Sequence, residues 1–99
     1  MSIQALILTK IKDERARQDE KWGVQQHSLQ TWMTILGEEY GEACRAVCEF
    51  TFAKTQERED SEVLELKREL VRVAAVCVAA LKQLETIGPY PFQTEVKRE

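Results

Sequence analysis

Val73-Ala-Ala-Val-Cys-Val-Ala-Ala-Leu81 is a run of residues that are apolar or small on every side of a helix. This pattern is typical of a central helix that other helices cover. The surrounding periodicity predicts a helix from about residue 62 to residue 86, and Gly88-Pro89 ends it in the order common at helix C-termini. The run therefore predicts an all-α fold, a bundle of three main helices plus a short C-terminal segment.

Two further helices are predicted ahead of this run. From about Ile3 to Glu20, apolar residues at helical spacing give way to charged ones, which predicts a helix whose second half is exposed to solvent. Trp22-Gly23 ends this helix, and Ser28 is a candidate N-cap for a second helix from about Leu29 to Phe52.

The connection between the second and third helices, residues 54–61, is wholly polar and has no apolar period. It is predicted to be an exposed loop or a frayed helical extension, with Asp60 or Ser61 capping the third helix. In the C-terminal segment, residues 88–99, we expect residues 90–92 to fold back onto the bundle. Residues 1–99 are thus expected to form a single domain.

The composition sets limits on the class of protein. A chain of 99 residues buries only about two-thirds of the surface that its unfolded form exposes, so pairing with a second copy would help it. The net charge of -3 and the pI near 5.3 argue against a nucleic-acid-coating protein. Without a long apolar run or a recognisable leader, we expect no membrane span, no secretion and a cytoplasmic location.

Three cysteines and one histidine offer little independent chemistry. Cys44, Cys48 and Cys77 are expected to be reduced and packed as small hydrophobic side chains, since an odd number fits no closed set of disulfides. Too few soft ligands remain for a structural zinc site. His27 lies in a polar stretch and is expected to be a solvated loop residue.

The acidic stretch Glu38-Glu39-Tyr-Gly-Glu42 is a candidate functional site because its spacings place carboxylates on one helix face. An apolar arc of the same helix is expected to face the core; it consists of Trp32, Leu36, Ala43, Val47 and Phe50. Glu39 lies only about 60° around the helix from Leu36, on the margin of this arc. An unpaired carboxylate there is costly to desolvate unless it binds a cation or a proton.

Glu69 is the charged residue of the third helix nearest to its apolar stripe. Two antiparallel helices would therefore gather Glu39, Glu42 and Glu69 into one cleft. Carboxylate oxygens suit hard divalent cations, Mg²⁺ or Mn²⁺. The alternative is a glutamate-rich helix surface that is simply solvated.

The motif Glu38-Glu39-Tyr-Gly-Glu42, with Glu69 further along, resembles the EExxE…ExxD signature of the MazG-like all-α nucleoside triphosphate pyrophosphohydrolases. Other stretches similar to small bacterial, phage and mobile-element members are Glu14-Arg-Ala-Arg17-Gln-Asp-Glu-Lys21-Trp22-Gly23 with His27 after it, Trp32, and Glu69-Leu-Val-Arg-Val-Ala-Ala. The resemblance covers most of residues 10–82. It implies a helical bundle, completed by dimerisation and sometimes forming tetramers, that uses Mg²⁺ to hydrolyse a nucleoside triphosphate to monophosphate and pyrophosphate.

One position departs from the family pattern, because Arg72 stands where the second motif ends in a metal-binding aspartate. Arginine cannot ligate a cation. Arg72 could pair with Glu69 or Glu65, or contact a substrate phosphate. Replacement ligands for the lost aspartate are Asp60, Glu62 or Glu65.

The resemblance implies roles for the remaining residues. Glu39, Glu42 and Glu69 would hold the metal, and Glu38 would be a further ligand or the base that deprotonates water. Candidates for substrate contacts are Arg17, Lys21 and Arg72 on phosphate and Trp22 or Trp32 on the base, although both tryptophans could equally pack in the core or at a dimer contact. The competing interpretation is a catalytically degenerate helical module that binds a nucleotide or a protein partner.

Overall fold

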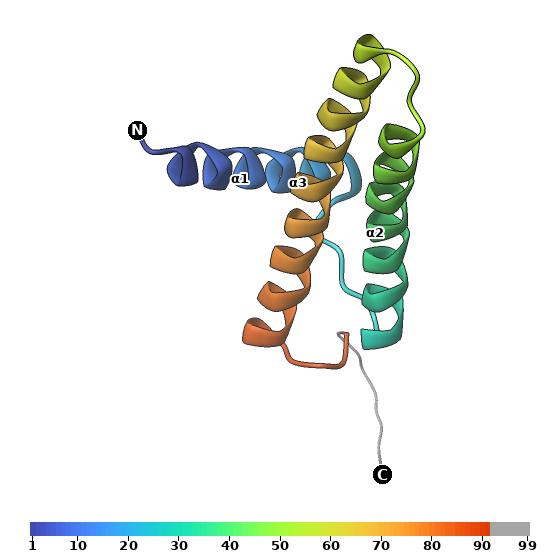
Figure 1. Ribbon diagram of the computed structural model, residues 1–99. Helices are drawn as coiled ribbons and strands as arrows, with labels where there is room; N and C mark the ends of the chain where they lie inside the picture. The colour runs from blue at the N-terminus through green and yellow to red at the C-terminus, as the bar shows by residue number, and fades with distance from the viewer. Residues whose placement is uncertain (92–99) are drawn as a thin grey trace.

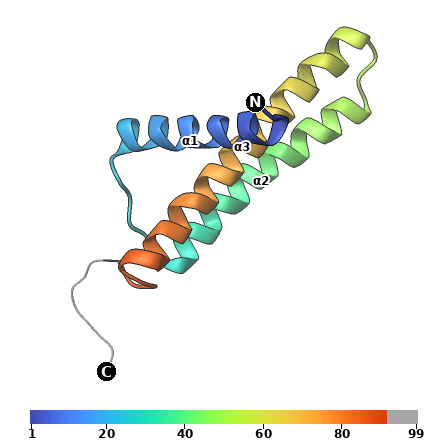
Figure 2. The same ribbon diagram turned by 90° about the vertical axis from the view of Figure 1, so that its left-hand side faces the viewer.

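The computed structural model describes residues 1–91, which contain three α-helices and no strand. These are α1 (Ile3–Trp22), α2 (Leu29–Thr51) and α3 (Gln56–Thr86). α2 and α3 lie side by side as an antiparallel hairpin, and α1 crosses α3 (Figures 1 and 2). Within the described range α1 packs on α3 alone and makes no contact with α2. The all-α class and the central place of α3 are confirmed.

Side-chain caps define where the helices begin. Ser28 caps α2 as predicted, because its hydroxyl accepts a hydrogen bond from the backbone N–H of Thr31 at 3.1 Å. α3, however, begins at Gln56 and not near residue 62, since Thr55 accepts from the N–H of Arg58 at 3.1 Å. The prediction of a loop over residues 54–61 and of a cap at Asp60 or Ser61 is therefore wrong, and the alternative of an exposed helical extension is right.

The helix ends follow the predicted residues. α1 stops at Trp22, and Gly23 has a φ of 78°, a value that glycine adopts without strain. α3 stops at Thr86, and Gly88, with a φ of 93°, donates its N–H to the carbonyl of Gln83 at 2.9 Å. Residues 92–99, part of the predicted C-terminal segment, lie outside the described residues, and so does the expected folding back of Phe92.

The core of the hairpin is small. Its buried apolar side chains are Trp32, Ala43, Ala46, Ala75 and Val76. Val47 and Phe50, which were expected to face the core, are 46% and 41% exposed. The reason is that α2 has one helical neighbour, α3, which covers the face around Ala43 and Ala46 and leaves the next face of α2 open.

The exposure of the two halves of α1 is the reverse of the prediction. Its apolar first half protrudes from the hairpin (Figure 1), and Ile3, Leu6 and Ile7 are exposed. Its charged second half packs on α3, where Arg15 is 7% exposed and donates a hydrogen bond to the carbonyl oxygen of Ala75 at 2.8 Å. Arg15 also pairs with Asp19 at 3.1 Å, so its charge is compensated within α1.

Gln83 joins the loop before α2 to the end of α3. Its Oε1 accepts hydrogen bonds from the Trp32 indole N–H at 2.8 Å and the His27 backbone N–H at 2.9 Å, and its Nε2 donates to the His27 carbonyl at 2.8 Å. The His27 ring meets Trp32 edge-on at 4.7 Å, and its Nε2 is buried. His27 is therefore half-buried and structural, not the solvated residue that was expected.

Two apolar stripes remain open on the hairpin. Met33, Tyr40 and Val47 on α2 and Val63, Leu70 and Leu84 on α3 are all exposed. Members of the stripes repeat at intervals of seven, the spacing of helices that pack in bundles. Helical geometry places both stripes on the side of the hairpin roughly opposite α1.

The cysteines of α2 share this open surface. All three cysteines are free, but Cys44 and Cys48 are exposed and only Cys77 is half-buried. The expectation that all three pack as small hydrophobic residues is therefore wrong for the two on α2 in the single chain. None of the described helices is both long and apolar enough to cross a membrane.

Candidate functional site

A groove of about 250 Å³ runs between α2 and α3 near the turn of the hairpin. Its lining, here called the acidic groove, consists of Glu42, Arg45, Glu49, Arg58, Glu62 and Glu65. Four carboxylates and two guanidinium groups thus meet in one concave surface. Such a surface can hold a cation between the carboxylates or a polyanion against the arginines.

Most of the groove charges are paired with each other. Arg45 pairs with Glu42 at 2.9 Å, and Arg58 pairs with Glu49 at 3.1 Å and with Glu62 at 3.0 Å. Glu65 pairs with Arg68, outside the groove lining, at 3.2 Å. These arginine side chains are more than half exposed, so the pairs contribute little to stability and can exchange for a ligand at low cost.

Glu69 lies beside the acidic groove, one helical turn beyond Glu65, and is only 3% exposed. Its Oε2 accepts a hydrogen bond from Arg72 at 2.7 Å. Its Oε1 is buried with no donor in range among residues 1–91. The carboxyls of Glu65 and Glu39 lie close to the Glu69 carboxyl, and carboxyl groups can hydrogen-bond to each other only by sharing a proton.

The neighbouring carboxyls and burial shift the pKa of Glu69. Burial and hydrogen bonding with Glu65 raise it from 4.5 to about 7, Glu39 adds to the rise, and the charge of Arg72 opposes it. The same hydrogen bond from Glu69 lowers the pKa of Glu65, with Arg68 and Arg72 assisting. Near pH 7 Glu69 is therefore about half protonated, and it shares this proton with Glu65.

Arg72 takes the first of its predicted alternatives, the ion pair with Glu69. It also lies close enough to Glu14 of α1 to help lower the pKa of that carboxyl to about 2, a shift caused chiefly by the hydrogen bond from Arg17. Arg72 thus faces carboxylates on two helices, and its side chain is 37% exposed. This position leaves it free to exchange between Glu69 and solvent.

The structure brings some of the predicted metal ligands together and not others. Glu39 and Glu69 are neighbours, as the wheel argument predicted. Glu42 lies at the rim of the acidic groove, where its side chain is 51% exposed and bound to Arg45. Glu38 is exposed on α2. Glu65, which was only one of three possible replacement ligands, is the residue that links the groove to Glu69.

The predicted substrate-contacting residues lie elsewhere on the chain. Arg17 pairs with Glu14 at 2.7 Å on α1, and the Lys21 ammonium lies 4.8 Å from the ring of Trp22, which is 61% exposed. Trp32 is 2% exposed, so it packs in the core and offers no face to a base. None of these three α1 residues, Arg17, Lys21 and Trp22, lines the acidic groove.

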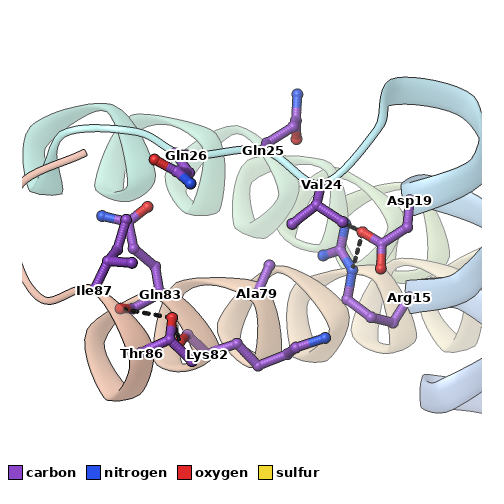
Figure 3. Close-up of a pocket in the computed structure, with 10 residues that line it drawn as sticks. All are labelled: Arg15, Asp19, Val24, Gln25, Gln26, Ala79, Lys82, Gln83, Thr86 and Ile87. Atoms are coloured by element: carbon purple, nitrogen blue, oxygen red, sulfur yellow. Dashed lines mark hydrogen bonds and ion pairs between the residues drawn. The ribbon is translucent and has the colours of Figure 1, made fainter. Parts of the chain in front are cut away.

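A second pocket, of about 200 Å³, lies where α1 and the following loop meet the C-terminal part of α3 (Figure 3). Its walls mix apolar side chains with amides and charges, namely Arg15, Asp19, Val24, Gln25, Gln26, Ala79, Lys82, Gln83, Thr86 and Ile87. Sequence reasoning did not find this pocket, because its residues come from three separate segments with no shared spacing. α1 contacts α3 at Ala75, which lies along the chain between Glu69 and the first pocket residue of α3, Ala79, so the two sites are separate.

The side chains fit a divalent cation only in part. As they stand, no three His, Cys, Asp or Glu side chains of residues 1–91 are grouped so that they could hold a metal ion. The chemistry nevertheless suits one, since an orphaned buried carboxylate oxygen adjoins two further carboxylates. Cation binding would require Arg72 to leave Oε2 of Glu69 and the shared proton to depart.

No protein-family model, curated protein or solved structure matches the chain.

Proposed function

We propose that this chain is a Mg²⁺-dependent hydrolase that converts ribo- or deoxynucleoside triphosphates to monophosphate and pyrophosphate, with Mn²⁺ able to replace Mg²⁺. The observation that supports it is the buried Glu69, whose Oε1 has no donor among residues 1–91 and lies beside Glu39 next to the acidic groove. A structural helix rarely retains a carboxylate in this state. The motif resemblance supplies the reaction, and a cytoplasmic role in cleaning nucleotide pools would fit it.

In this proposal Glu39 and Glu69 would hold Mg²⁺ from facing helices, and Glu42, at the groove rim, would be a further ligand once it releases Arg45. Bound Mg²⁺ would neutralise the triphosphate and polarise the α-phosphoryl group. The exposed Glu38 takes the proton of a water molecule whose oxygen bonds to the α-phosphorus. The bond from that phosphorus to the bridging oxygen breaks, and pyrophosphate leaves with the electron pair.

Substrate contacts in the proposal come from the cations and the ring near these acids. Arg72, once released from Glu69, would bind a phosphate as a two-pronged donor. Arg17 and Lys21 would approach the phosphates and Trp22 the base from α1. None of these three α1 residues lines the acidic groove. A bound substrate would therefore have to extend from the groove to α1, or a second copy of the chain would have to bring its α1 to the groove.

We further propose that the chain works as a homodimer or a tetramer. The support is the pair of open apolar stripes on one side of the hairpin, which a second hairpin would cover to complete a four-helix core. The acids lie away from this side, so dimerisation leaves the groove open. We expect no nucleic acid and no membrane among the partners.

The second candidate is a module that binds a nucleotide or a protein without turnover. The ion pair between Arg72 and Glu69 favours it, because a fixed positive charge occupies an oxygen that a metal would need. The two candidates differ in turnover, which a direct assay can measure.

The test is to incubate the pure chain with each common ribo- and deoxynucleoside triphosphate and Mg²⁺ and to assay pyrophosphate. We expect release that depends on Mg²⁺ and that Glu39→Gln lowers by at least about a hundredfold, because it removes a ligand charge. Glu57→Gln, an exposed change in the first turn of α3, is the matched control and should retain activity. If no nucleotide yields pyrophosphate, the hydrolase proposal fails, and nucleotide binding without turnover would favour the second candidate.

A further inference from the structure

We propose that the pocket between α1, the loop of residues 23–28 and the C-terminal part of α3 binds a small organic carboxylate whose apolar body is the size of a single ring. The side chains that line this pocket are those drawn in Figure 3. Because the pocket is separate from Glu69 and the acidic groove, the inference goes beyond the proposed function and does not depend on it.

Hydrogen bonds between segments that are distant in the sequence fix the walls of the pocket. At one end Arg15, 7% exposed, donates to the carbonyl oxygen of Ala75 at 2.8 Å and so ties α1 to α3. At the other end Gln83, 5% exposed, bonds to the backbone N–H and carbonyl of His27 and holds the loop against α3 (Figure 3). Walls held in this way are formed before a ligand arrives, which lowers the free-energy cost of binding.

The charged side chains of the lining leave one positive charge unbalanced. They are Arg15, Asp19 and Lys82. Asp19 pairs with Arg15 at 3.1 Å, whereas Lys82 pairs with no carboxylate among residues 1–91. The Lys82 side chain extends along α3 toward the end of the pocket that Arg15 occupies (Figure 3). One uncompensated ammonium group suits a ligand with a single carboxylate better than a doubly charged phosphate.

The apolar part of the lining suits the body of such a ligand. Val24, Ala79 and Ile87 contribute apolar surface, and Val24 and Ile87 are 80% and 46% exposed, so a ligand would cover surface that water now contacts. The pocket volume of about 200 Å³ is below that of pockets for drug-sized molecules. A cavity of about 150 Å³ engineered into another protein holds benzene, so a ring that carries one carboxylate matches the volume of this pocket.

The test is a titration of the full isotope-labelled chain with sodium benzoate, followed by two-dimensional NMR of the backbone amides. We expect a Kd of about 1 mM or lower, as a ligand of this size can reach, with shift changes confined to the pocket. Two matched probes separate the parts of the ligand: benzamide has the same shape without the charge, and acetate has the charge without the ring. Each should bind at least about threefold more weakly than benzoate.

Variants of the lining test the same contacts from the side of the protein. Lys82→Met removes the charge, keeps an unbranched side chain and should raise the Kd for benzoate at least about threefold. Ala79→Leu fills part of the pocket and should abolish the local shift changes. The matched control is Lys67→Met, an exposed change on α3 outside the lining, which should leave the Kd within about 1.5-fold of the parent value. Circular dichroism confirms that each variant retains its helices.

Four results would overturn the inference. They are an absence of shift changes at benzoate concentrations up to about 20 mM, changes that follow the open stripes of α2 and α3 instead of the pocket, a probe without charge or ring that binds as tightly as benzoate, and an unchanged Kd in Lys82→Met. Pyrophosphate release tests the hydrolase proposal separately, so either proposal can fail while the other holds.

Discussion

Arg72 donates a hydrogen bond over 2.7 Å to Oε2 of Glu69, whose side chain is 4% exposed. The pair joins a permanently charged group at the surface to a carboxyl that is buried one turn away on α3. It satisfies one oxygen of Glu69 and leaves the other against two further acids. In the proposed function, Arg72, a proton and a divalent cation compete for Glu69.

Removing the guanidinium should strengthen cation binding. We expect Arg72→Met to lower the Kd for Mn²⁺ by about tenfold, because the fixed charge no longer repels the ion and Oε2 becomes free. Titration calorimetry with Mn²⁺ measures this change, and Lys67→Met, an exposed change on α3 outside the groove lining, is the matched control. If Arg72 also binds phosphate, the tighter cation binding will be accompanied by slower turnover. A weaker or unchanged Mn²⁺ affinity would show that Arg72 does not oppose the metal.

Stability should fall as pH rises between about 4.5 and 7. In the folded chain Glu69 keeps its proton up to a pKa of about 7, whereas its ordinary pKa is 4.5, so the folded state binds more protons in this window. The free energy of unfolding then decreases by at most about 3 kcal/mol and levels off above the window. Glu39 and Glu65 promote this behaviour and Arg72 opposes it. Urea unfolding across this pH range measures it.

Glu69→Gln is the control for the pH effect, since an amide fills the same space and does not titrate. This variant should lose the decline between pH 4.5 and 7 and keep the part of the acid limb that comes from Glu14. The pKa of Glu14 is lowered to about 2, so its contribution is present above pH 4.5 and is lost as pH falls toward 2. An identical slope in the parent and in Glu69→Gln would show that Glu69 is not the titrating group.

The helices were predictable because local signals agree with the final packing. Ser28 is a side-chain cap, and Gly23 and Gly88 end helices at positive φ, so both features can be recognised from sequence. The start of α3 was missed because its first turns are polar and have no apolar period; they meet α2 through charges, such as the pair between Arg58 and Glu49. The packing of the charged half of α1 on α3 was missed because it depends on a distant contact. Arg15 is buried against the carbonyl of Ala75, which lies 60 residues away in the sequence.

The site was predictable as far as single-helix geometry extends. Glu39 and Glu69 were found because each lies on the margin of its own apolar stripe. Wheel angles do not say which cations pair with each carboxylate. Arg45 of the same helix, for example, pairs with Glu42 at the surface. The closeness of Glu65 to Glu69 follows from their spacing, but its significance appears only once Glu69 is known to be buried.

Gln83 should be essential for stability. We expect Gln83→Leu to lower the free energy of unfolding by roughly 3 kcal/mol, because the indole N–H of Trp32 and the backbone N–H of His27 lose their acceptor inside the fold. Gln30→Leu, on the exposed surface of α2, is the control and should change it by less than about 0.5 kcal/mol. Urea denaturation measures both. A small effect of Gln83→Leu would mean that water replaces the lost acceptor.

Leu70 should lie within the contact between two copies of the chain. It is 54% exposed at the centre of the α3 stripe, seven residues from both Val63 and Cys77, and it belongs to the side of the hairpin opposite α1. A second hairpin packed there would bury Leu70, so a charge at this position would have to be desolvated without a partner. Leu70→Glu should therefore yield monomers at concentrations where the parent chain is dimeric or tetrameric.

Sedimentation velocity over a concentration series measures the mass of each variant in solution. The control is Leu8→Glu, which places the same charge on the protruding part of α1, where Leu8 is 56% exposed. If the hairpin stripes form the contact, only Leu70→Glu dissociates the oligomer. If Leu8→Glu alone dissociates it, copies associate through α1 instead, and the four-helix arrangement is wrong. A parent chain that is monomeric at every concentration excludes both arrangements, because the apolar stripes would then remain in water.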